Sequence, residues 1–244
     1  MTVAPTKRSG VARAVASLAT IIVGVILALA ANAWWQNRQD RARIHGYLEM
    51  LQVDLRATDS LIDKSIAQDQ RSGTDSQRMV NTLLSARSWT ELPESVNPHF
   101  GIDDVWFRTG TVDALLSTGD INKVGSAALR SALVRYVDEV DQIRSSLDKA
   151  ETAAWNNGRE FEHAREELLA TAGTDALRRR APGLPPAQLL RSFSLAQVRR
   201  YPQIIAAFQL HDIAMANRIE ILRNAKAPVE DLLGLLDREL GEGR

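Results

Sequence analysis

One long apolar run and three helical stripes dominate the pattern of apolar and polar residues. Residues 14–35 (AVASLATIIVGVILALAANAWW) contain no charged side chain. A helix of this length spans about 33 Å, which matches the roughly 30 Å hydrocarbon core of a bilayer. Trp34 and Trp35 end the run, where aromatic rings prefer the headgroup region. The run therefore predicts a transmembrane anchor that includes Gly24, Ala28, Asn32 and both tryptophans.

A cleaved signal peptide is the competing interpretation of this run. Basic residues precede it, and two Ala-x-Ala patterns, at residues 28–30 and 31–33, lie near its end. The run exceeds the roughly 7–15 apolar residues of a signal peptide, and helical periodicity continues after it, so an uncleaved anchor is favoured. The small residues Ala16, Thr20, Gly24 and Ala28 lie four apart and could form a helix-packing seam, although small residues are common in membrane helices generally.

Three further stretches place mostly apolar residues three or four apart, which puts them on one face of a helix; in the first two the spacing alternates strictly. The stretches are Ile44, Leu48, Leu51, Leu55, Thr58 and Ile62; Leu129, Leu133, Tyr136, Val140, Ile143, Leu147, Ala150 and Ala154, continuing with Asn157, Phe161, Ala164 and Leu168; and Ile204, Phe208, His211, Met215, Ile219 and Leu222. Such narrow stripes require partner helices, and no window has the period of a strand. We predict an all-α fold, in which the transmembrane helix runs into an elongated antiparallel bundle with coiled-coil-like packing over residues 36–244.

Glycine and proline predict where these helices begin and end. Ser72-Gly73-Thr74 predicts a break, followed by a short helix with Met79, Leu83 and Leu84. Pro202 predicts a helix start, and Pro228 predicts the end of that helix and the start of a last amphipathic segment. Residues 88–101 and 172–194 are predicted to be the long connections.

Two segments resemble a family of uncharacterised bacterial single-pass membrane proteins, known only as a domain of unknown function. The first is residues 23–34 (VGVILALAANAW) with Asn37-Arg38 and the later LEMLQVDL at residues 48–55. The second is residues 112–120 (VDALLSTGD), followed by Leu129-Arg130 and Tyr136. The chain departs from the family pattern at Ala31 and by its second tryptophan. The resemblance implies an uncleaved anchor with a helical domain, and it supplies no catalytic or binding residue.

Charge determines the expected orientation. Lys7, Arg8 and Arg13 are the only charged residues before Gln36, and three arginines follow the run within about 15 residues, so the positive-inside count is tied. The absence of acids from residues 1–13 favours this basic tail in the cytoplasm of a bacterium, with the large domain in the periplasm. The chain has no cysteine, which excludes disulfides and fits that compartment.

Thr111 and Gly119 predict a structural turn. Thr111 is a plausible N-cap for a helix over residues 111–118, and Gly119 a plausible C′ residue in the left-handed conformation. Such a corner would aim the following long helix against the first one; a recognition turn is the functional alternative.

The candidates for chemistry are weak. Glu160 and His163 form an E-x-x-H pair as in di-iron bundles, but no second such pair exists, so a solvated helix face is favoured. His211 fits a hydrogen-bonded core histidine better than a ligand, and Asp103-Asp104 fit the start of a helix. The arginines at positions 178–180, 191, 199 and 200 could contact phosphate, although a solvated loop is favoured. We predict no catalytic, cofactor or metal site.

Function is therefore argued from architecture. The net charge of zero argues against a nucleic-acid binder. We expect a non-enzymatic scaffold or interaction protein of the bacterial inner membrane that contacts the lipid bilayer and binds a protein partner or itself. The alternative is a receptor-like sensor subunit whose bundle binds a small ligand and signals through a partner.

Overall fold

The computed structural model describes residues 8–101 and 104–242, and within these ranges the fold is entirely helical, which confirms the predicted all-α class. Its α-helices are α1 (Arg8–Ser85), α2 (Gly110–Ser117), α3 (Ala127–Ala172), α4 (Asp175–Arg180), α5 (Pro186–Leu190), α6 (Leu195–Val198) and α7 (Pro202–Glu242). Three 3-10 helices join them: η1 (Trp89–Glu91), η2 (Asp120–Lys123) and η3 (Ala181–Gly183).

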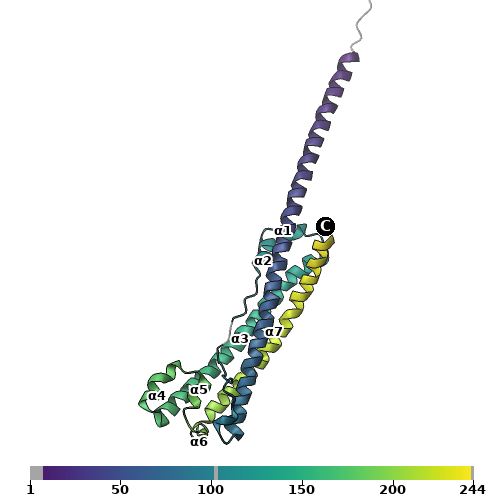
Figure 1. Ribbon diagram of the computed structural model, residues 1–244. Helices are drawn as coiled ribbons and strands as arrows, with labels where there is room; N and C mark the ends of the chain where they lie inside the picture. The colour runs from purple at the N-terminus through teal and green to yellow at the C-terminus, as the bar shows by residue number, and fades with distance from the viewer. Residues whose placement is uncertain (1–7, 102–103, 243–244) are drawn as a thin grey trace, which may run out of the picture.

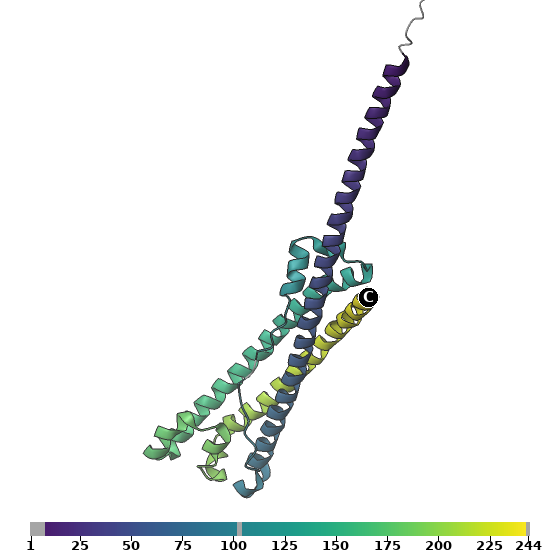
Figure 2. The same ribbon diagram turned by 45° about the horizontal axis from the view of Figure 1, so that its top comes forward.

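The three long helices form a bundle with α7 at its centre. Helix α7 packs against both α1 and α3 and runs antiparallel to them (Figures 1 and 2). The C-terminal end of α7 lies at the end of the bundle from which the first part of α1 projects (Figure 1). The short helices α4, α5 and α6 lie at the opposite end.

The predicted break at residues 72–74 is wrong, because α1 continues unbroken through them to Ser85. Gly73 allows α7 to approach closely: a Cβ atom there would lie 3.1 Å from Asp212 Oδ1 and 3.5 Å from the Met215 Cβ. The Thr74 hydroxyl donates to the carbonyl of Gln70 within the helix. These small residues therefore serve helix packing rather than a turn.

The predicted end at Pro228 is also wrong, because α7 continues to Glu242. A proline inside a helix removes one backbone hydrogen bond, here the one to the carbonyl of Asn224, and costs about 3 kcal/mol. Val229, Leu232 and Leu236 follow the proline and are buried in the bundle core, so their burial keeps this last segment helical. Pro202 does begin α7, as predicted.

The predicted stripes form most of the core, in two separate clusters. The first core cluster joins α1, α3 and α7 near η2, around Leu51, Leu133 and Leu222. The second core cluster lies at the far end, around Leu83, Phe161 and Phe208, and includes the short helices α5 and α6. The predicted connection at residues 172–194 is thus largely folded into short helices against this second cluster.

The corner before α3 has the predicted glycine but a different cap. Gly119 has φ 72°, in the left-handed region. The N-cap of α2 is Thr109, whereas Thr111 lies one residue inside the helix, where its buried hydroxyl donates to Asp54 Oδ2 at 2.7 Å. The predicted capping role of Thr111 is therefore wrong, since its hydroxyl instead ties α2 to α1.

Replacing Gly119 with alanine is expected to lower the free energy of unfolding by about 1 kcal/mol, because a side chain is strained at this φ. Nothing else would obstruct the new Cβ atom. Gly110→Ala is the matched control, since that helical glycine is equally open and has no positive φ. Chemical denaturation of both variants checks the prediction, and equal stabilities would contradict it.

Candidate functional site

The first candidate is the projecting part of α1, which no other helix covers (Figure 1). Its large apolar side chains are exposed, with Ile21 at 61%, Leu27 at 64% and Trp34 at 62%. Arg38 stacks over the ring of Trp34, with its guanidinium carbon 5.8 Å from the ring centroid. Gly24, Ala28, Asn32 and Trp35 lie on this same exposed segment. Among the residues whose side chains are described, which leave out residues 14–16 and 19–20, no helix is long and apolar enough to cross a membrane.

A network of ion pairs joins α1 to η2 where α1 enters the bundle. Arg43 contacts Asp40 at 2.9 Å and Asp120 at 3.0 Å, and Lys123 contacts both carboxylates at 3.1 Å. The hydrogen bond from Lys123 lowers the pKa of Asp120 and raises that of Lys123. Ile44, the first buried residue of α1, follows directly. The network therefore ties η2 to α1 at the point where α1 leaves the bundle.

A polar layer separates the two core clusters. Asp69 on α1 and Arg218 on α7 form a buried ion pair with Nη1 and Oδ1 3.2 Å apart. Glu151 on α3 faces the same layer. Burial raises the pKa of its carboxyl group, and the charge of Arg218 partly offsets this rise. Ser65 and Ser76 of α1 are also buried. The layer thus holds charged groups from all three long helices.

His211 lies in this layer, fully buried, with its Nε2 atom 3.0 Å from the Ser72 hydroxyl. That hydroxyl donates its single hydrogen to the carbonyl of His99, so Nε2–H of the histidine must be the donor to Ser72. Burial, together with a smaller contribution from the charge of His99, lowers the pKa of His211 to about 4. Because His211 does not accept the serine proton, this pair lacks the arrangement of a serine nucleophile with its base.

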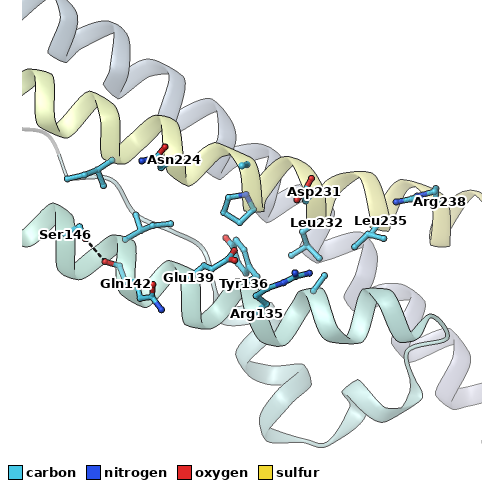
Figure 3. Close-up of a pocket in the computed structure, with 15 residues that line it drawn as sticks. Arg135, Tyr136, Glu139, Gln142, Ser146, Asn224, Asp231, Leu232, Leu235 and Arg238 are labelled. Atoms are coloured by element: carbon cyan, nitrogen blue, oxygen red, sulfur yellow. Dashed lines mark hydrogen bonds between the residues drawn. The ribbon is translucent and has the colours of Figure 1, made fainter.

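A groove between α3 and α7 has a volume of about 570 Å³ (Figure 3). Tyr136, Pro228 and Leu232 border its floor. The Tyr136 hydroxyl is buried and has no hydrogen-bond partner among the described residues, and its burial raises the pKa of Tyr136 to about 12. The rims carry charged side chains, Arg135 and Glu139 on α3 and Asp231 and Arg238 on α7. The groove is thus a depression of mixed polarity on the face of the bundle.

The predicted metal pair does not gather further ligands. Glu160 and His163 are exposed on α3, and the described part of the chain contains no group of three or more side chains that could hold a metal ion. Asp103 lies outside the described residues, and Asp104 lies in a non-helical segment before α2.

The arginine cluster is not simply a solvated loop. Arg199 donates to the carbonyls of Leu83 and Ala86 at the end of α1. Arg178 donates to the last turn of α3, and Arg191 to the carbonyls of Leu92 and Pro93. These three side chains satisfy backbone carbonyls where helices and loops end. Arg179, Arg180 and Arg200 are exposed.

No family model, curated protein or solved structure matches this chain. The resemblance described from the sequence therefore stays an expectation, and function must be argued from the arrangement of the residues themselves.

Proposed function

We propose that this chain is a single-pass membrane-anchored scaffold or interaction protein of the bacterial envelope. The observation that carries the proposal is the projecting part of α1, whose exposed apolar side chains need a cover that residues 36–101 and 104–242 do not provide. Residues 14–35 match the thickness of a bilayer, and Trp34, Trp35 and Arg38 suit the interface that follows.

The bundle then stands close to the membrane. Ile44 follows Trp35 by nine residues, which is about 14 Å of helix. Residues 36–244 form the periplasmic domain, an elongated antiparallel bundle with coiled-coil-like packing, and residues 1–13 are the cytoplasmic tail. Helix α1 runs unbroken from the anchor into the domain, and the ion pair between Arg43 and Asp120 ties η2 to it. A protein partner or a second copy of the chain binds the exposed faces of the bundle, and neither nucleic acid nor a cofactor has a role.

Protease protection in spheroplasts tests the proposal, with a C-terminal tag on the full-length chain. We expect a membrane-retained, full-length band that protease digests from outside in intact spheroplasts. Protection until the membrane is permeabilised would place the domain in the cytoplasm. Release of a shortened soluble form would show cleavage after one of the Ala-x-Ala patterns and contradict the anchor.

A second candidate function is a sensor subunit, and the groove between α3 and α7 is the observation that favours it. A ligand held by both helices would shift their packing, and the ion pairs at η2 would pass that shift to α1. A ligand-dependent rise in the melting temperature of the purified chain distinguishes a sensor from a scaffold.

A further inference from the structure

The groove between α3 and α7 carries an ordered pattern of charge along its length. Arg135 on α3 and Arg238 on α7 lie toward the end of the bundle from which α1 projects (Figures 1 and 3). Glu139 on α3 and Asp231 on α7 lie next, farther from that end (Figure 3). Along the groove the two arginines therefore form a cationic band nearer that end, and the two carboxylates form an anionic band next to it (Figure 3).

These four side chains form no ion pair within 4.0 Å in the part of the chain that the structure describes. Two arginines from different helices can share one anionic group, and two carboxylates can share one ammonium group. The same pattern opposes a parallel dimer through this face, because each band of one copy would meet the same charge on the other copy.

The spacing of the bands sets the length of the ligand. Arg135 and Glu139 are four residues apart, about 6 Å along α3, and Asp231 and Arg238 are seven apart, about 10 Å along α7. An extended peptide spans about 3.3–3.6 Å per residue, so the termini of a chain of two or three residues fit this interval. The volume of about 570 Å³ lies within the usual range for small-ligand sites.

We propose that this groove binds a zwitterionic peptide of two or three residues, with its carboxylate between Arg135 and Arg238 and its ammonium group between Glu139 and Asp231. The floor residues Pro228 and Leu232 take the apolar side chains of the peptide. The Tyr136 hydroxyl, buried at the floor without a partner in the described structure, supplies a donor for a peptide carbonyl. This inference does not depend on the membrane anchor, because it concerns only the bundle.

Titration calorimetry of the purified full-length chain in non-ionic detergent tests the proposal, with trialanine as the probe. We expect saturable binding of trialanine, and binding at least about tenfold weaker for trialanine with an acetylated N-terminus or an amidated C-terminus, since each loses a charged hydrogen bond. The absence of saturable binding for both trialanine and dialanine, or equal binding of the blocked peptides, would overturn the proposal.

Two variants assign each end of the peptide. Glu139→Gln should weaken trialanine about tenfold and leave the acetylated peptide unchanged, whereas Arg135→Gln should do the same for trialanine and leave the amidated peptide unchanged. Asp138→Asn and Arg223→Gln are matched controls, since both residues are exposed on the same helices outside the groove. Equal losses in the controls and the groove variants would overturn the assignment, because general electrostatics would then explain the binding.

Discussion

Replacing Arg218 with alanine is expected to lower the free energy of unfolding by about 3–5 kcal/mol, because it leaves a buried carboxylate without its counter-charge. Arg218 is 1% exposed and Asp69 is 4% exposed, so water screens neither group. The substitution also removes the positive charge that lowers the pKa of Glu151, whose carboxyl group faces the same layer. Chemical denaturation of the full-length chain, followed by helical circular dichroism, measures the loss.

Two further variants separate the buried charge from ordinary packing. Asp69→Leu combined with Arg218→Met is expected to be far less destabilising than Arg218→Ala, because it removes the buried carboxylate of Asp69 together with the arginine that pairs with it. Arg56→Ala is the surface control: Arg56 lies 3.4 Å from Asp237, both side chains are exposed, and its loss should cost at most about 1 kcal/mol. An Arg218→Ala loss no greater than that of Arg56→Ala would contradict the prediction.

The polar layer lies on a continuation of the first predicted stripe of α1. The stripe that ends at Ile62 continues at the same spacing through Ser65, Asp69, Ser72 and Ser76 to Met79, and all of these residues lie on the face of α1 that packs against the bundle. The three-four alternation is thus unbroken, and only the chemistry of the side chains changes. A polar residue at a core position of a long helix is therefore the signal that could have located this layer.

The two wrong helix ends have a common physical reason. Gly73 and Pro228 each weaken the helix locally, but each lies in a long helix whose flanking residues are buried against neighbours. The burial of residues such as Leu83 and Leu232 in the core outweighs the local cost of a glycine or proline in a helix, which is at most about 3 kcal/mol. The stripes themselves predicted the core well, because an apolar stripe marks the face of a helix that is buried.

The groove could not have been predicted from the sequence. Its bands of charge depend on which residues of α7 lie near Arg135 and Glu139. That register is set by helix packing between residues that are more than 90 positions apart in the chain. Each charged residue alone is typical of a solvated helix face. Similarly, Arg178 and Arg199 donate hydrogen bonds to backbone carbonyls because the folded chain places them at the ends of α3 and α1. The sequence alone does not show this placement.

Acidification is expected to destabilise the bundle through His211, by up to about 3 kcal/mol between pH 7 and pH 4. Burial holds the pKa of this histidine at about 4, compared with 6.5 when it is exposed in the unfolded chain. Because the folded pKa is the lower one, the unfolded state binds the proton first as the pH falls through 6.5, and each unit of pH then favours unfolding by about 1.4 kcal/mol. Below about pH 4 both states are protonated and the loss stops growing.

The difference between the wild-type chain and His211→Gln isolates this effect. The groups packed around the histidine are Ser72, His99 and the ring of Phe100, whose centroid lies 4.8 Å away, so glutamine keeps a donor toward Ser72 without a titrating group. Unfolding free energies of both chains at pH 7, 6, 5 and 4.5 should converge as the pH falls, whereas His163→Gln, at an exposed site on α3, should leave the slope of the wild type unchanged. The carboxylates titrate in every chain and cancel in the comparison. A constant difference across this range would contradict the prediction, because it would mean that the pKa of His211 is the same in the folded and the unfolded chain.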